Sequence, residues 1–383
     1  MKGRVLVAGA GHVGLYAACA FAGKGYEVHL FDQLDESGVI RRYAWADSIE
    51  PCAVEALGLP VPIEVNGRLQ GELVKKTPDP ESEGVFQYRR SSSGDYLIDR
   101  GGLTIWQIKQ ARRAGVHLHF SSKVKELLGI LGPELEDIDV TGFSVQEEGT
   151  ERVYQADLVI DATGIDAVLR RQLIPDAIGK KTDLPQFSSF KSVRRFKGTI
   201  TPGETHFPFQ YMGHMNLEGV RGYTWMSRLG EDVVDLGCCI EVFEPDGGET
   251  ARKIGLAGIK SFPPLAEGQI LIEGSGVMPC GSSPATFVAG GFAAVGDSAV
   301  MTDEIGRGIT GGIQAGTFLA DNLVKKQDFT IAGLWPAAYH WYNEKGLNRY
   351  PAEWDKALFS EWKIRVCRED CYSMAEDRYK KQK

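Results

Sequence analysis

The sequence has no uninterrupted apolar run of about 18 residues, the length that a membrane-spanning helix needs. Met1 to Ala22 resembles a signal peptide, because Lys2 and Arg4 precede an apolar stretch. Glycines and one histidine interrupt that stretch, and their spacing has a better explanation, given below. We therefore expect no transmembrane segment.

An excess of positive charge is also missing. The chain has 43 Lys and Arg against 51 Asp and Glu, with a net charge of −8 and a pI near 5.5. The charges form no long block of one sign, and the basic clusters are short. A nucleic-acid-binding domain usually carries a basic patch or stripe. We expect no nucleic-acid partner.

Cysteine is too scarce for a disulfide scaffold. The seven cysteines are an odd number in a chain of 383 residues. Cys367 and Cys371 are close together, but no second Cys or His pair lies near them to complete the four ligands of a zinc site. We expect free thiols, no metal site and a cytoplasmic location.

Glycine is abundant instead, at 46 of 383 residues against a usual share of roughly 7%. One group forms the pattern Gly9-x-Gly11-x-x-Gly14 between an apolar strand, Val5 to Ala8, and an Ala-rich helix. A second strand follows and ends at Asp32. In such a β-α-β unit the glycines permit a tight turn, the helix start binds a pyrophosphate and the acidic residue binds ribose hydroxyls. The pattern predicts a dinucleotide site without separating FAD from NAD.

The rest of the chain divides into further expected elements. Short alternating segments between residues 188 and 243 indicate an antiparallel sheet, hence a second domain. Residues 40 to 95 carry several prolines and are expected to be irregular. The expected helices are 100–114, 250–259 and one ending near 323; the expected strands are 116–120, 143–147, 153–160, 189–200, 206–212, 222–228, 232–242, 269–277 and 287–295.

Three passages carry a resemblance to a known family. They are Asp99-Arg100-Gly101-Gly102-Leu103, the run Asp157 to Gly164 ending in Asp-Ala-Thr-Gly, and Val295-Gly296-Asp297-Ser298-Ala299 with Gly306-Arg307-Gly308-Ile309 after it. Their order resembles the flavoproteins that include p-hydroxybenzoate hydroxylase, and within that group the geranylgeranyl reductases. The resemblance spans residues 1 to about 325 and selects FAD as the cofactor.

The resemblance also implies roles for individual residues. Arg100 would lie near the cofactor phosphates, Asp297 would accept a hydrogen bond from the ribityl chain, and the helix after Gly308 would begin at the pyrimidine edge of the flavin. The full set of expected cofactor-binding residues is Gly9, Gly11, His12, Val13, Gly14, Asp32, Gln33, Arg42, Arg100, Val124, Ala162, Thr163, Gly164, Gly296, Asp297, Gly308 and Ile309.

The reaction is less fixed than the cofactor. Tyr223 and Trp225 resemble the Tyr-x-Trp segment of geranylgeranyl reductases, and with Cys280 they are the substrate-pocket candidates. Two residues apart on a strand, Tyr223 and Trp225 should share one face. Ala162-Thr163-Gly164 favours the reductases, because aromatic hydroxylases more often carry Ala-Asp-Gly there. Catalytic side chains are not identified by any pattern.

We therefore expect an α/β fold with a Rossmann-like FAD domain (1–45, 96–175 and 282–325), interrupted by an antiparallel-sheet substrate domain (46–95 and 176–281). A helical C-terminal segment covers 326–383. The predicted function is FAD-dependent reduction of carbon–carbon double bonds in an isoprenoid or similar apolar substrate, with a small molecule or lipid as partner. The alternatives are an FAD-dependent monooxygenase, less favourably a halogenase, and a non-enzymatic flavin-bound sensor or assembly factor.

Some properties stay open at this stage. The electron donor is NAD(P)H or reduced ferredoxin, and a lipid substrate is compatible with peripheral membrane contact. The oligomeric state is not determined by the sequence.

Overall fold

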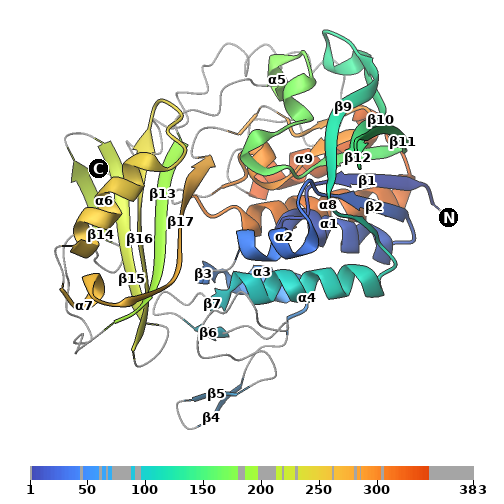
Figure 1. The fold of residues 1–383 in the computed structure, drawn as a ribbon. Coiled ribbons are helices and arrows are strands. Elements are labelled where there is room, and N and C mark those ends of the chain that lie inside the picture. The colour runs from blue at the N-terminus through green and yellow to red at the C-terminus, as the bar shows by residue number, and fades with distance from the viewer. Residues whose placement is uncertain are drawn as a thin grey trace.

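The computed structural model places two modules side by side (Figure 1). It describes residues 2–43, 46–59, 63–65, 68–70, 88–90, 96–179, 186–196, 213–217, 220–228, 232–260, 263–279, 283–284, 286–302 and 306–344. Cys280, the expected strand 206–212 and the C-terminal stretch from 345 onward lie outside these residues.

The first module is built on a six-stranded sheet in the order β18-β19-β12-β1-β2-β8. Neighbouring strands run parallel except at the β18 edge. Val5 to Ala8 in β1 are completely buried, as expected for a short apolar run at the centre of a parallel sheet. The bounds are β1 Arg4–Ala8, β2 Glu27–Phe31, β8 His117–His119, β12 Leu158–Asp161, β18 Val288–Ala289 and β19 Phe292–Ala294.

Two layers cover this sheet (Figure 1). Helices pack on one face, and a three-stranded antiparallel sheet packs on the other, where Phe31 meets Phe143 with ring centroids 5.2 Å apart. The helices are α1 His12–Gly23, α4 Arg100–Arg113, α8 Ile309–Lys326 and α9 Ile331–Glu344; the strands are β9 Ser122–Leu131, β10 Ile138–Glu147 and β11 Thr150–Gln155.

The second module is a five-stranded antiparallel sheet in the order β14-β15-β16-β13-β17. Helix α6 packs across one face, where Phe190, Leu236 and Cys238 form a buried core. Gly255 allows this approach, because a Cβ there would stand 2.1 Å from the Phe190 ring. The bounds are β13 Gln186–Arg195, β14 Gly213–Leu217, β15 Val220–Arg228, β16 Val233–Val242, β17 Gln269–Pro279, α6 Glu249–Lys260 and α7 Pro263–Ala266.

Short elements complete the described chain. They include a strand β3 that pairs with β7 directly before α4. Their bounds are α2 Glu36–Arg42, β3 Ala46–Ile49, α3 Pro51–Ala56, β4 Ile63–Val65, β5 Arg68–Gln70, β6 Tyr88–Arg90, β7 Tyr96–Asp99, η1 Leu135–Asp137, η2 Gly164–Asp166, η3 Arg170–Gln172, α5 Asp176–Gly179 and η4 Gly296–Ala299.

The predicted fold class is confirmed, but three element predictions are wrong. The expected strand 153–160 is two strands, because the chain turns at Asp157, whose carboxylate accepts the backbone N–H of Arg4 at 2.8 Å. The expected strand 287–295 is a tight hairpin, because Gly291 turns the chain with φ +64°. Residues 40–95 contain α3 and several short strands rather than only irregular structure.

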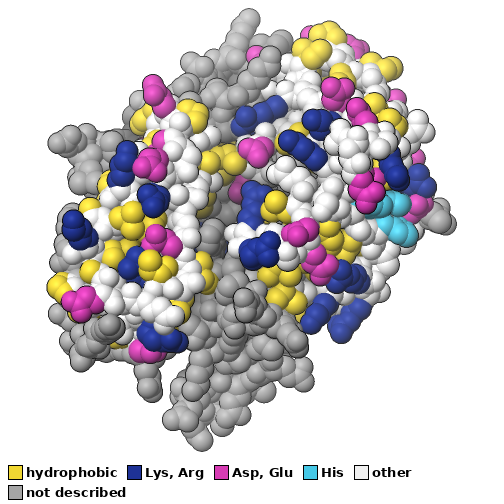
Figure 2. Space-filling view, viewed as in Figure 1, with side chains coloured by type: hydrophobic (Ala, Val, Ile, Leu, Met, Phe, Trp, Pro, Cys, Tyr) yellow, Lys and Arg dark blue, Asp and Glu magenta, His cyan; other side chains and the backbone are white. Residues whose placement is uncertain are grey.

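The surface and the helices bear on the expected partners. On the face shown in Figure 2, Lys and Arg are interspersed with Asp and Glu. Among the helices that the structure describes, none is long and apolar enough to cross a membrane.

Candidate flavin site

The glycine turn between β1 and α1 is closely packed. Gly9 has φ +104°, and a Cβ there would stand 2.3 Å from the carbonyl oxygen of Ala162. Gly14 lies against the turn itself, with 2.0 Å between a Cβ position and the oxygen of Gly9. No side chain caps the start of α1 at Gly11. The turn therefore presents backbone and the positive end of a helix dipole, which suits an anion such as a pyrophosphate.

Asp32 is fixed beside this turn. Its carboxylate accepts the N–H of Ala10 and the N–H of Leu34, both at 2.8 Å. Gln33 next to it is exposed, and Val124, near the start of β9, has a buried side chain. These residues lie together at the carboxyl edge of β2, the position where the ribose of a dinucleotide binds in this type of sheet.

Arg100 reaches the glycine turn from the start of α4. Its Nε donates to Nε2 of His12 at 3.2 Å, and a second nitrogen donates to Asp47 at 2.9 Å. Burial, followed by the charge of Arg100, lowers the pKa of His12 to about 3. His12 is therefore neutral, and since Nε2 accepts, its Nδ1 donates to Gln107 at 2.7 Å. This arrangement places a guanidinium where phosphates are expected.

Tyr43 is a residue that the sequence analysis missed. Its ring lies 4.6 Å from the His12 ring and 4.8 Å from the Arg100 guanidinium carbon. Its hydroxyl is 2.9 Å from the Cβ position of Gly11, and burial raises its pKa. Arg42 contacts the same ring at 5.9 Å. Tyr43 thus lies over the expected phosphate site, and no local pattern around it signals this.

The Asp-Ala-Thr-Gly passage forms a second turn, which packs against the glycine turn between β1 and α1. Asp161 is completely buried and accepts hydrogen bonds from the backbone N–H and the hydroxyl of Thr163 and from the backbone of Leu169 and Arg170. Asp161 therefore shapes the loop rather than contacting a ligand. Ala162 lies directly against Gly9, which leaves backbone facing the dinucleotide turn.

The passage from Gly296 to Ala299 packs against the start of α1, close to the start of α8. Gly296, at φ +69°, packs on Val13, and a Cβ on Gly308 would stand 2.3 Å from a carboxylate oxygen of Asp297. Burial raises the pKa of Asp297, while the charges of Arg100 and Arg42 oppose this rise. Ile309 begins α8 directly after Gly308. Asp297 and the start of α8 thus lie next to each other.

The antiparallel sheet brings aromatic side chains to this region. The rings of Tyr223 and Trp225 are 5.9 Å apart on one sheet face, and Phe187 lies 5.9 Å from Tyr223. Phe187 also packs against the turn before α8, 3.4 Å from the Cβ position of Gly306. The shared face of Tyr223 and Trp225 is confirmed, and it borders the module that carries the glycine turns.

The same sheet face carries polar residues that the sequence did not single out. Lys191 lies 5.2 Å from the Trp225 ring and 4.0 Å from Asp47 of the short strand β3. Asp235 is buried, with its pKa raised to about 6 by desolvation. The alternation of strand residues is the only sequence signal that could have grouped them, and it requires knowing the strand register.

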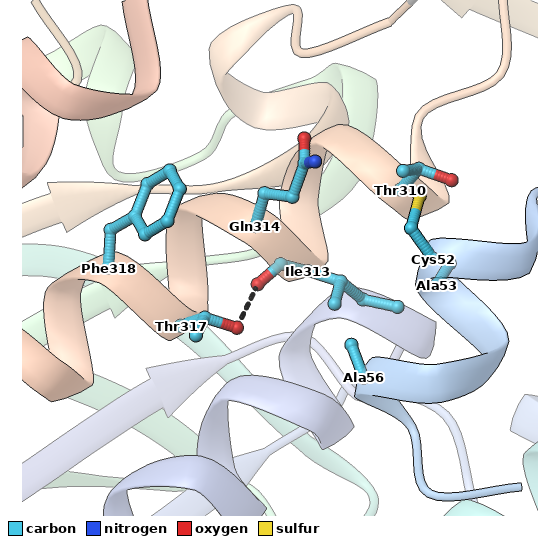
Figure 3. Close-up of a pocket in the computed structure, with 8 residues that line it drawn as sticks. All are labelled: Cys52, Ala53, Ala56, Thr310, Ile313, Gln314, Thr317 and Phe318. Atoms are coloured by element: carbon cyan, nitrogen blue, oxygen red, sulfur yellow. Dashed lines mark hydrogen bonds between the residues drawn. The ribbon is translucent and has the colours of Figure 1, made fainter. Parts of the chain in front are cut away.

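A separate cavity of about 190 Å³ lies between α3 and α8. Ile313 points toward Ala56, and Cys52 lies beside Thr310 (Figure 3). Its lining is mostly apolar, and it flanks α8 rather than facing the Tyr223–Trp225 sheet. The full lining is Cys52, Ala53, Ala56, Thr310, Ile313, Gln314, Thr317 and Phe318.

The residues present fit FAD. A Cβ at Gly9 or Gly14 would overlap backbone atoms, so the turn needs glycine there. Asp32 would supply an acceptor for a ribose, and Arg100 would supply a cation for a pyrophosphate. Asp297 would supply a second acceptor, for a ribityl chain. Chain segments about 290 residues apart in sequence form this set.

Comparisons with known proteins agree with this assignment. No family model matches the chain. The digeranylgeranylglycerophospholipid reductase of Methanothrix thermoacetophila is 23% identical over 350 residues, which cover 90% of this chain and 84% of that protein.

Solved structures show the same fold. The geranylgeranyl bacteriochlorophyll reductase-like protein of Thermoplasma acidophilum superposes with a TM-score of 0.66 at 15% identity, over 98% of both chains. A myxobacterial chondrochloren halogenase, a variant of FAD-dependent halogenases, gives 0.59 at 16% identity over 98% of this chain and 89% of its own. The resemblance to geranylgeranyl reductases is confirmed, and the predicted class, an FAD-dependent oxidoreductase, is borne out.

Proposed function

We propose that this protein is an FAD-dependent reductase of carbon–carbon double bonds in isoprenoid or similarly apolar substrates. One observation carries this proposal. The glycine turns before α1 and α8 lie together with Asp32, Arg100 and Asp297, beside the sheet face that carries Tyr223 and Trp225. The similarity to a digeranylgeranylglycerophospholipid reductase over most of the chain supports the substrate class.

Each group in the site has a distinct part in binding. The start of α1 and Arg100 would hold the pyrophosphate, Asp32 the ribose hydroxyls and Asp297 the ribityl chain. Bound FAD, once reduced, supplies a hydride equivalent to the substrate. The dipole at the start of α8 would favour negative charge near it.

The sheet would hold the substrate. An apolar surface that suits a flexible hydrocarbon chain is formed by the rings of Phe187, Tyr223 and Trp225. Tyr223 and Trp225 each add one polar group, a hydroxyl and an indole N–H. Cys280 directly follows β17 in sequence and stays a pocket candidate. Covering the reacting atoms with these rings would keep water away from them.

The remaining assignments are proposals of the same kind. We assign the FAD domain to 1–45, 96–175 and 282–325, the substrate domain to 46–95 and 176–281, and a cytoplasmic location with peripheral membrane contact when the substrate is a lipid. NAD(P)H and reduced ferredoxin are the candidate donors, and rapid anaerobic reduction of the bound flavin by one of them identifies the donor.

An FAD-dependent monooxygenase is the second candidate, favoured by the halogenase-like superposition. Anaerobic spectroscopy separates the two. Flavin in the purified protein is reduced with dithionite just to the endpoint, and a geranylgeranyl lipid is added. Reoxidation without oxygen, with a saturated lipid as the inert control, is the expected result. Reoxidation only on admitting air, with every isoprenoid tried inert, would favour the monooxygenase.

A further inference from the structure

Asp235 lies on the sheet face that looks away from α6. Phe190, Leu236 and Cys238 face α6, so their neighbours in the sequence face the opposite side. In the strand pairing, Asp235 lies opposite Val193 of β13 and Ser227 of β15. Lys191 and Trp225 are two residues away from these partners on the same strands and therefore face the same side. Asp235 therefore shares the face of the proposed substrate site.

The carboxyl group is buried and incompletely bonded. Asp235 is 2% exposed, and its Oδ1 has no hydrogen-bond partner among the residues that the structure describes. The Trp225 side chain donates a hydrogen bond to this carboxyl group. A buried acceptor without a partner is costly when charged, and protonation removes most of that cost.

The charged groups around Asp235 come from several elements. Lys191 of β13 favours its ionised form, whereas Asp47 of β3 disfavours it, and Arg100 in turn pairs with Asp47. Desolvation is the largest influence and raises the pKa of Asp235 from 3.8 to about 6. Cys239 shares this face, but burial raises the pKa of its thiol above 9.0, which makes it a weaker acid.

We propose that Asp235 is the general acid that protonates the substrate. This inference rests on the proposed reductase function, which requires one proton besides the hydride. The hydride carries two electrons from reduced FAD to one alkene carbon, so FAD is oxidised and the alkene reduced. The Asp235 O–H bond breaks as a C–H bond forms at the other carbon. The resulting carboxylate is stabilised by Lys191 and regains a proton from water.

A first test needs neither FAD nor substrate. The indole N–H of Trp225 reports the charge of Asp235 through their hydrogen bond, and Trp225→Phe assigns its signal in the ¹⁵N–¹H spectrum. Its shift should titrate with a midpoint near pH 6 in the wild-type protein and stay flat in Asp235→Asn. A signal that does not change between roughly pH 4 and pH 8 in the wild type, or that titrates equally in the variant, would overturn the proposal.

The second test measures the chemical step. Reoxidation of reduced protein by the lipid under argon should slow by roughly 100-fold or more in Asp235→Asn, in kcat rather than KM, while the FAD affinity is unchanged. Asp232→Asn is the control, because Asp232 is exposed, directly precedes the same strand and pairs with Arg195. An unreactive wild type defeats the reductase assignment and, with it, this role. A reactive wild type matched by Asp235→Asn defeats only the general acid.

Discussion

Asp235 links the chemistry of the site to the stability of the fold. Its carboxyl is buried, and its pKa in the folded protein is raised from 3.8 to about 6. The folded state therefore holds this proton more tightly than the unfolded state does. Proton binding at Asp235 therefore contributes to the free energy of unfolding. This contribution is fully present below pH 3.8 and is lost as the pH rises through about 6.

Asp235→Asn should consequently be more stable than the wild type at about pH 8 and nearly equal to it at about pH 4. The difference in the free energy of unfolding should approach 3 kcal/mol, on the order of the cost of the pKa shift. Urea denaturation of both proteins at the two pH values measures this, and other titrating groups cancel in the comparison. A difference that does not depend on pH would contradict the raised pKa.

At the scale of elements, the turn after β12 and the turn before α8 are tied together by buried polar groups. Arg170 is completely buried and donates to the carbonyl oxygens of Ser298 and Ile178. The Ser298 hydroxyl in turn donates to the carbonyl of Asp161 at 2.6 Å. These contacts join the end of β12 to the turn that carries Asp297, so buried polar groups of the protein hold the two passages together.

Arg170→Met should lower the free energy of unfolding by about 3 kcal/mol, because two buried carbonyl groups lose their donor. Arg171→Met is the matched control, since the neighbouring Arg171 is exposed and should cost little. Urea denaturation at neutral pH measures both. Equal losses in the two variants would show that burial of Arg170 does not decide the effect.

The packing of α1 on the glycine turn gives a second prediction at this scale. A Cβ at Gly14 would stand 2.0 Å from the oxygen of Gly9, whereas at Gly23 it would meet nothing within 4 Å. Gly14→Ala should distort the turn and reduce FAD bound per chain severely. Gly23→Ala, in the same helix, should keep it. Flavin absorbance after purification in excess FAD gives the ratio, and full occupancy in Gly14→Ala would contradict the site.

At the scale of the whole molecule, the two modules meet through charge. Lys191 of the antiparallel sheet lies 4.0 Å from Asp47, and Asp47 is paired with Arg100 at the glycine turn. The chain of contacts continues to His12 in the turn itself. Asp47, which is paired with Arg100 of the cofactor module, therefore acts on Asp235 in the substrate sheet.

Substitutions on either side of this boundary should move the pKa of Asp235 in opposite directions. Asp47→Asn removes a negative charge and should lower it, and Lys191→Met removes a positive charge and should raise it. The Trp225 indole signal gives both midpoints. An unchanged midpoint in Asp47→Asn would mean that β3 does not approach the antiparallel sheet in solution as it does in the structure.

The glycine turn and the position of Asp32 beside it could be predicted, because their motifs are local. Gly9, Gly11, Gly14 and Asp32 follow one another within a single β-α-β unit, and the resemblance added Arg100 and Asp297. Tyr43, Asp47 and Gln107 were missed, because each reaches the glycine turn from a separate element. The strand at 153–160 was misjudged, because an apolar run does not reveal that the chain changes sheets at Asp157.

The flavin class was implied by the resemblance to a known family. The sequence by itself determined the dinucleotide turn and the presence of a second, antiparallel sheet. These depend on spacing within short segments, where backbone geometry restricts the residues that fit. Only the tertiary structure decided which face of that sheet meets the cofactor module and that Asp235, Lys191 and Trp225 lie together on it. Burial raises the pKa of Asp235, and the strand register decides which residues lie next to it. Both arise only when segments distant in the sequence pack together.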